Sequence, residues 1–258
     1  MKTISFVIPV YNEEERLAKT LIALKGLSLP RGLKLETVIF VNDGSTDSTL
    51  KILNNFKKQL EKRLKSEVKI ISYKVNKGKG YAISVGMCKS SSDYSLFFDA
   101  DMSTKISEIK KFLPFIRKNI PIIIGTRKNS HSTVIRHQPF LREMLGRGFT
   151  LLSNIVLNTW VTDFTCGFKA FSTDAKDVLF PKLKINSWGF DAELLFLGRI
   201  KGFEFVEVPV IWSDDRRSKV KIWKDLPKSL IDLFSIRLNH TIPKPAFSFV
   251  KVLKNYLF

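Results

Sequence analysis

Short apolar runs alternate with segments of helical periodicity along the first half of this chain, and this alternation constrains the fold more than any other feature. Each run is followed by a loop and then by leucines or small residues at helical spacing. Strands that alternate with helices form a largely parallel sheet with right-handed crossovers. The pattern therefore predicts an α/β fold with strands at residues 4–10, 35–41, 68–73, 96–98 and 121–125.

Charged side chains stand at the carboxyl ends of these predicted strands. Asp43 follows the second strand, Asp99 and Asp101 follow the fourth, and Arg127 follows the fifth. Open α/β sheets bind ligands at this edge. Two carboxylates spaced i, i+2 can converge on a hard cation whose other ligands are phosphate oxygens and water. The sequence thus predicts a Mg²⁺ or Mn²⁺ site for a phosphorylated substrate, although Asp-x-Asp after a strand also occurs as ordinary loop chemistry.

The loops after the first and third strands carry further polar groups. Asn12 is a predicted helix N-cap, and the three glutamates that follow it suit the first turn of a helix. The sequence Asn-Lys-Gly-Lys-Gly at 76–80 places glycines and lysines before a helix, which allows the backbone to approach an anion closely. Its spacing matches neither the P-loop nor the dinucleotide-binding fingerprint.

The large positive net charge of the chain favours an anionic binding partner. With 43 Lys and Arg against 24 Asp and Glu, the formal net charge of +19 favours nucleic acid, lipid headgroups or phosphorylated small molecules, unless it is only a solvated basic surface. The two cysteines, Cys88 and Cys166, indicate no disulfide framework and fit a reducing, cytosolic compartment. We recognise no secretory signal and no apolar run of about 18 residues, so we expect membrane association to be peripheral.

The rest of the chain is less regular. Helices are predicted at 107–118 and up to about residue 160, a Gly-containing turn at 163–169 and a late strand at 203–212. From residue 216 to 258, basic residues are interleaved with aromatic ones, which is typical of a segment at a membrane interface.

Together these stretches resemble the inverting glycosyltransferases of family 2, which have the GT-A fold, and among them the polyprenyl-phosphate sugar transferases of the dolichyl-phosphate glucosyltransferase and mannose synthase type. The matching motifs follow the family's order through nearly the whole chain. They are Val-Ile-Pro-Val-Tyr-Asn-Glu at 7–13, Asn-Asp-Gly-Ser at 42–45, Asn-Lys-Gly-Lys-Gly at 76–80, Asp-Ala-Asp at 99–101, Gly-Thr-Arg at 125–127, Cys-Gly-Phe-Lys at 166–169, Phe-Asp-Ala-Glu-Leu-Leu at 190–195 and Ser-Lys at 218–219. The segment 232–238 resembles the glucosyltransferase branch in particular.

The resemblance implies a donor site with a metal. Asp99 and Asp101 would hold Mg²⁺ or Mn²⁺ against the diphosphate, and Asp43 would read the base. Ser103 stands where the mannose synthases have a Gln metal ligand. The residues implied to line the nucleotide-sugar pocket are Pro9, Tyr11, Glu13, Asp43, Lys77, Gly78 and Asp99.

The acceptor phosphate needs cations to hold it beside a second anion. The candidates are Arg127, Arg136, Arg142 and Lys219, with Ser218 beside the last. Catalytic roles fall to Arg127, Lys219 and Asp191, the last as a base or as a group that orients the cations. The segment 214–217, Asp-Asp-Arg-Arg, precedes Ser218 where the family more often has glycine beside the serine.

The implied reaction moves a hexose, glucose by the branch resemblance, from a UDP- or GDP-sugar to a polyprenyl phosphate. A phosphate acceptor with a second pKa of about 6 is largely dianionic at neutral pH, so it needs a general base less than a sugar hydroxyl does. Transfer to a sugar hydroxyl in polysaccharide or glycan synthesis is the alternative, and nucleotidyl transfer is more remote. A nucleic-acid-binding module is most remote, because it leaves the acidic strand ends unexplained; we therefore expect no nucleic-acid partner.

The expected organisation follows from these roles. A GT-A catalytic domain would cover residues 1–215, with a nucleotide-sugar half to about residue 127 and an acceptor half from about residue 128. A basic tail over 216–258, with one amphipathic helix at 222–238 and another formed by the final residues, would lie on an anionic membrane surface at its cytosolic face. The oligomeric state is left open.

Overall fold

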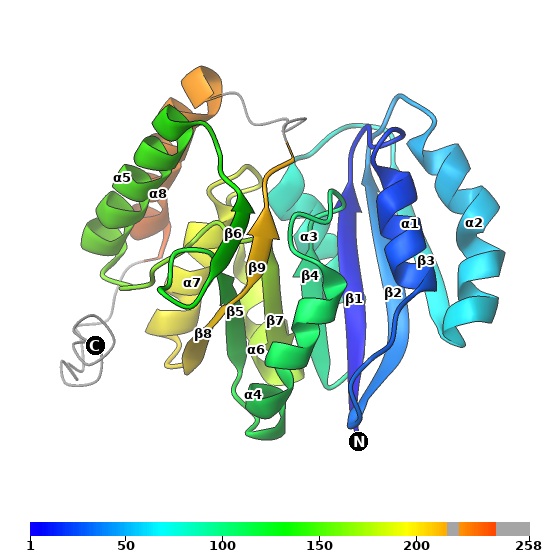
Figure 1. Ribbon diagram of the computed structural model, residues 1–258. Helices are drawn as coiled ribbons and strands as arrows, with labels where there is room; N and C mark the ends of the chain where they lie inside the picture. The colour runs from blue at the N-terminus through cyan, green and yellow to red at the C-terminus, as the bar shows by residue number, and fades with distance from the viewer. Residues whose placement is uncertain (216–221, 241–258) are drawn as a thin grey trace.

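The computed structural model describes residues 1–215 and 222–240, with side chains from residue 227 in the second range. Its centre is a seven-stranded sheet of order β3-β2-β1-β4-β7-β5-β8 (Figure 1). Neighbouring strands pair in parallel except around β7, which is antiparallel to both β4 and β5. The predicted α/β fold with a mostly parallel sheet is therefore confirmed. The strands are β1 Lys2–Val10, β2 Leu33–Asp43, β3 Glu67–Tyr73, β4 Tyr94–Phe98, β5 Ile122–Thr126, β7 Phe168–Ser172 and β8 Phe205–Pro209.

Helices cover both faces of this sheet, and each face has its own apolar core. In β1, Ile4, Phe6 and Ile8 belong to one core and Val7 to the other, as the two-residue period of a strand requires. One face carries α1 Leu17–Lys25, α2 Thr49–Leu64, the 3₁₀ helix η1 Ile106–Lys111 and α4 Leu113–Arg117. The other carries α3 Lys79–Cys88, α6 Thr173–Leu179, the 3₁₀ helix η2 Phe180–Lys182, α7 Phe190–Ile200 and α8 Ile222–Asn239.

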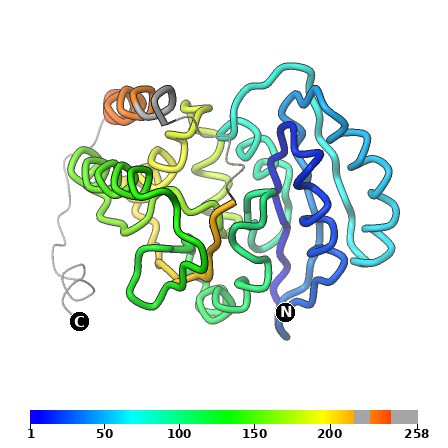
Figure 2. The backbone as a smooth tube through the Cα atoms, turned by 45° about the horizontal axis from the view of Figure 1, so that its top comes forward, coloured from blue at the N-terminus to red at the C-terminus, as the bar shows by residue number. Residues whose placement is uncertain are grey.

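Segments from the second half of the chain lie beside the carboxyl ends of the sheet strands. The strands β6 Thr133–Arg136 and β9 Ile211–Ser213 form a two-stranded parallel sheet, which an isolated bridge from Thr104 to Trp212 joins to the loop after β4. The helix α5 Phe140–Leu157 lies beside α8 in both views (Figures 1 and 2). Residues far apart in sequence thus meet around the ends of β4 and β5.

Two local predictions are wrong for reasons of backbone conformation. Asn12 has a positive φ of 51°, and its Oδ1 accepts a hydrogen bond from the Thr46 amide at 2.8 Å. It therefore ties two loops together, and the helix begins only at Leu17, after the three glutamates. The predicted helix at 107–118 is split into η1 and α4, because Pro114 has no N–H to continue the hydrogen-bond ladder.

The segments 163–169 and 203–212 also differ from their predictions. The predicted turn runs into β7 from Phe168 onward, which the sequence analysis did not identify as a strand. The late strand is two strands, β8 and β9, on either side of Val210, whose amide donates to the Thr126 carbonyl at 3.1 Å.

Candidate active site

A cavity of about 970 Å³ opens at the carboxyl ends of β1, β2, β4 and β5. Most of the residues that the sequence analysis selected line it, from both halves of the chain. These are Pro9, Tyr11, Glu13, Asp43, Lys77, Gly78, Asp99, Asp101, Arg127, Arg142 and Asp191. Arg136 instead lines an adjoining cavity of about 310 Å³, which also includes Asp101 and Ser103. Ser218 and Lys219 lie outside the described residues.

Asp99 and Asp101 sit in the loop directly after β4. The Asp99 amide donates to the Gly167 carbonyl at 3.3 Å, and Asp101 Oδ1 accepts from the Ser103 amide at 2.9 Å. Burial raises the pKa of Asp101, and the negative charge of Asp99 raises it further. Two carboxylates that repel each other in a half-buried loop form an arrangement that a cation stabilises.

The donor groups at this edge fit a divalent cation that also binds substrate oxygens. Among the residues that the structure describes, eight Lys or Arg and eight Asp or Glu side chains line the larger cavity, so their formal charges balance. Two anionic substrates in such a cavity need added positive charge. Within the described ranges no group of three or more His, Cys, Asp or Glu side chains is arranged so that it could hold a metal ion by itself. The carboxylate oxygens of Asp99 and Asp101 would suit Mg²⁺ or Mn²⁺ only with substrate oxygens and water as further ligands.

Asp43 organises the wall of the cavity formed by residues 76–78. Its Oδ1 accepts from the Lys77 amide at 2.8 Å, and its Oδ2 accepts from the Gly78 amide at 3.0 Å and from Asn76 Nδ2 at 2.9 Å. Gly78 has φ of 101°, and a Cβ there would lie 2.3 Å from the Asn186 carbonyl oxygen. The loop can take this path only with glycine at position 78 and a carboxylate beneath it.

Glu13 is buried and holds Arg16, whose Nε donates to Glu13 Oε2 at 2.6 Å. The Glu13 amide donates to Thr49 Oγ1 at 2.7 Å, which fixes the loop after β1 to the start of α2. Tyr11, on the same loop, is 38% exposed and lines the cavity. This loop therefore places the Tyr11 ring at the cavity, and the Glu13–Arg16 ion pair and the Thr49 hydrogen bond hold the loop in position.

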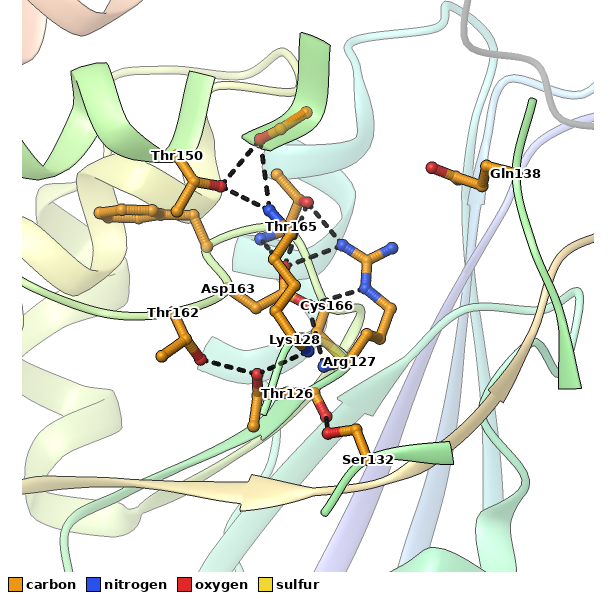
Figure 3. Close-up of polar contacts among 12 residues, drawn as sticks. Thr126, Arg127, Lys128, Ser132, Gln138, Thr150, Thr162, Asp163, Thr165 and Cys166 are labelled. Carbon is orange, nitrogen blue, oxygen red and sulfur yellow. Dashed lines mark hydrogen bonds and ion pairs between the residues drawn. The ribbon is translucent and has the colours of Figure 1, made fainter. Parts of the chain in front are cut away.

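Arg127 is held by a carboxylate that the sequence analysis did not select (Figure 3). Its Nε lies 2.7 Å from Asp163 Oδ2, its Nη2 lies 2.8 Å from Asp163 Oδ1, and Nη2 also donates to Thr165 Oγ1 at 2.8 Å. Burial raises the pKa of Asp163, but the Arg127 charge outweighs it and the net shift is well below the usual range. The guanidinium is thus fixed at the cavity, 5.2 Å from the Trp212 ring centre.

Asp191 contacts a second buried cation, Lys169 of β7. The Lys169 ammonium is fully buried and donates to Asp191 Oδ1, to the Phe164 carbonyl at 2.8 Å and to the Cys166 carbonyl at 2.7 Å. Burial raises the pKa of Asp191, and the Lys169 charge opposes that shift. Asp191 therefore lies in a fixed ionic contact at the floor of the cavity.

Lys128 reaches from the end of β5 to α5 (Figure 3). Its ammonium donates to Thr150 Oγ1 at 2.7 Å and to the Gly146 carbonyl at 3.2 Å, and in the part of the chain that the structure describes it has no carboxylate partner. Burial lowers the pKa of Lys128 below its usual value, and the negative charge of Asp163 only partly opposes that shift. This cavity-lining cation was also absent from the sequence-based selection.

The helices beside the cavity expose apolar side chains at helical spacing. On α5 they are Leu141, Met144, Leu151 and Ile155, and on α8 they are Ile231, Phe234 and Leu238. Leu233 and Ile236 of α8 are fully buried, so the helix is apolar on two sides. None of the helices in residues 1–215 and 222–240 combines the length and apolar character needed to cross a bilayer.

The fold and the site define a class, the glycosyltransferases of GT-A fold. Among solved structures, glucosyl-3-phosphoglycerate synthase from Mycobacterium tuberculosis, in complex with Mn²⁺, UDP and phosphoglyceric acid, superimposes with a TM-score of 0.64 at 17% identity, covering 94% of this chain and 80% of that chain. TarS of S. aureus in complex with UDP-GlcNAc gives 0.57 at 20% identity, covering 94% and 68%. These likenesses concern the fold.

Sequence comparison is more specific. A family model described as Glycosyl transferase family 2 matches residues 5–180. A dolichyl-phosphate beta-glucosyltransferase of Trichomonas vaginalis is 33% identical over 244 residues, which cover 91% of this chain and 70% of the relative. The enzymes of that name from Saccharomyces cerevisiae and Homo sapiens are 32% and 31% identical, covering 93% of this chain and 75% and 76% of theirs. The chain belongs to glycosyl transferase family 2, among the dolichyl-phosphate beta-glucosyltransferases.

Proposed function

We propose that this chain transfers glucose from UDP-glucose to dolichyl phosphate with inversion at the anomeric carbon. The observation that carries the proposal is that one cavity joins the Asp99–Asp101 pair to the fixed cations Arg127 and Lys128. The donor diphosphate and the acceptor phosphate could then bind side by side in this cavity, because the cations offset the repulsion between the two anions. The names of the relatives at 31–33% identity support glucose as the transferred sugar and dolichyl phosphate as the acceptor.

Asp99 and Asp101 would hold Mg²⁺ or Mn²⁺ in this reaction. When bound, such a cation acts as a Lewis acid that neutralises the leaving diphosphate. The solved neighbour that carries Mn²⁺ and UDP supports this choice of metal and of base. The wall of Pro9, Tyr11, Glu13, Asp43, Lys77 and Gly78 would bind the nucleotide, with Asp43 acting mainly through the backbone of residues 77 and 78.

Arg127 and Lys128 would bind the acceptor phosphate, with Arg142 of α5 beside them and with Arg136 and the predicted pair Ser218 and Lys219 as further contacts. Arg127 is oriented by Asp163, so no ordering of its side chain is needed when the phosphate arrives. Asp191 would orient cations and not act as a base, because its carboxylate contacts the Lys169 ammonium. The donor half of the domain would then end near residue 127 and the acceptor half begin at residue 128.

The acceptor is a lipid, and the apolar stripes of α5 and α8 support a membrane-facing side next to the cavity. Arg147 and Arg237 are exposed on these helices and would face anionic headgroups. Each such cation contributes roughly 1 kcal/mol near an anionic surface, and the apolar side chains add interfacial burial. We propose peripheral binding at the cytosolic face, to which the tail over 216–258 would add its basic and aromatic residues.

A donor and acceptor panel tests the proposal. The purified chain is incubated with UDP-glucose, GDP-mannose or UDP-GlcNAc, each with dolichyl phosphate, dolichol or a glucoside, in the presence and absence of Mg²⁺. We expect one metal-dependent product, glucosyl phosphoryl dolichol, detected by mass spectrometry. Glucose transfer to the glucoside without transfer to dolichyl phosphate would favour the sugar-hydroxyl alternative and refute the lipid acceptor.

A further inference from the structure

Lys79, which no role in the proposed reaction requires, is bonded to one of the two carboxylates of the cation site. Its Nζ lies 2.6 Å from Asp99 Oδ1, and its side chain is only 16% exposed. Gly167 closes the other side of this carboxylate, since a Cβ there would lie 2.1 Å from Asp99 Oδ2. Asp99 thus lies between the backbone of Gly167 and the ammonium group of Lys79.

The backbone of Lys79 is fixed as firmly as its partner. Lys79 is the first residue of α3, and a Cβ on Gly80 would lie 2.6 Å from Phe190 Cβ and 2.7 Å from the Ile185 carbonyl oxygen. The Gly80 amide donates to the Asn186 carbonyl at 2.9 Å. The start of α3 therefore cannot retreat, and only the side chain of Lys79 can leave Asp99.

The ion pair places a positive charge where the divalent cation would bind. A lysine ammonium is positively charged at neutral pH, and the ion pair holds this charge beside Asp99. A divalent cation at Asp99 would be repelled by this ammonium at contact distance. The same ammonium lies 5.0 Å from the Trp188 ring centre and lines the cavity, where a diphosphate offers it other oxygens.

We propose that Lys79 competes with the divalent cation for Asp99. The cation then binds tightly only together with a nucleotide diphosphate, because the diphosphate oxygens replace Asp99 as the partner of the Lys79 ammonium. Lys79 is in this sense a positioning residue that couples metal binding to donor binding. The inference rests on the proposed function in one respect, because it takes a nucleotide diphosphate as the donor.

Mn²⁺ titration, followed by the electron paramagnetic resonance signal of free Mn²⁺, tests this without turnover. Without nucleotide, Lys79→Met should bind Mn²⁺ about tenfold more tightly than the wild type, because the competing charge is gone. Lys79→Arg, which keeps the charge, should bind it as weakly as the wild type. With UDP present, the wild type should gain more Mn²⁺ affinity than Lys79→Met does.

Lys77→Met is the matched control. Lys77 lines the same cavity, but its ammonium contacts Tyr81, with Nζ 3.3 Å from Tyr81 Oη and 4.6 Å from the Tyr81 ring centre. Removal of this charge should change Mn²⁺ affinity much less. Unchanged or weaker Mn²⁺ binding by a folded Lys79→Met variant, or equal tightening by Lys77→Met, would overturn the inference. If Mn²⁺ binding by Lys79→Met is unchanged or weaker but the wild type still transfers glucose to dolichyl phosphate, only the inference fails and the proposed function stands.

Discussion

Asp163→Asn should be one of the most destabilising single changes in the chain. Asp163 is fully buried, and it accepts from Arg127 Nε, Arg127 Nη2 and the Arg127 amide, the last at 3.1 Å. The asparagine keeps the shape but leaves the Arg127 charge without a counter-charge. Removing one partner of a buried ion pair costs about 3–5 kcal/mol. At about 2–4 °C per kcal/mol for a chain of this size, the melting temperature should fall by roughly 6–20 °C.

Urea unfolding followed by circular dichroism measures this loss at equilibrium. Glu67→Gln is the control, since Glu67 forms an ion pair with Lys69 at 3.1 Å in which its side chain is 56% exposed. Such an exposed pair contributes at most about 1 kcal/mol. A loss in Asp163→Asn no larger than that of the control would refute the reasoning about Arg127.

The pH dependence of the same difference gives a second check. The pKa of Asp163 is lowered in the folded protein, so its contribution to stability is fully present above the unfolded value of about 3.9 and is lost as pH falls below it. The asparagine does not titrate. The stability difference between wild type and variant should therefore be constant between about pH 6 and pH 8 and should shrink as pH falls below about 4.

Three further predictions concern chemistry, membrane binding and thiol reactivity. Asp191→Asn should reduce turnover less than Asp101→Asn, which should cost at least about 10²-fold, because a dianionic acceptor needs no base whereas the cation site needs its carboxylate. Leu151→Ser combined with Phe234→Ser should weaken salt-sensitive co-sedimentation with anionic vesicles. Burial raises the pKa of Cys166 to about 12, so this thiol should resist alkylation at pH 8 until the chain is unfolded.

A different result would contradict each of these three predictions. An Asp191→Asn loss equal to that of Asp101→Asn would favour a hydroxyl acceptor. Vesicle binding that falls equally in Ile22→Ser, a change at an exposed residue of α1, would show that the α5–α8 face has no special role. Rapid native alkylation of both cysteines would contradict the burial of Cys166, since Cys88 is the exposed one.

The sequence was sufficient to place the residues at the ends of parallel strands. Asp43, Asp99, Asp101 and Arg127 meet in one cavity because β2, β4 and β5 run in the same direction, which puts their carboxyl ends at the same edge of the sheet. The apolar runs that predict these strands are buried on both faces, so their signal is strong.

The groups that orient the site could not be predicted in the same way. Lys169 is the second residue of β7, and a lysine there breaks the apolar pattern of a buried strand. Its partner Asp191 is 22 residues away, and Asp163 is 36 residues from Arg127. Lys77 and Lys79 both stand next to Gly78 in the sequence, and the ion pair of Lys79 with Asp99 becomes visible only in the structure.

The anomeric configuration of the product tests the central claim most directly. The purified chain is given UDP-glucose, whose sugar is α-linked, dolichyl phosphate in detergent and Mg²⁺, and the lipid product is examined by proton NMR. Our account predicts only the β-linked glucosyl phosphate, formed at least about 10²-fold more slowly by Asp101→Asn. An α-linked product, or undiminished product from Asp101→Asn with EDTA present, would contradict the account.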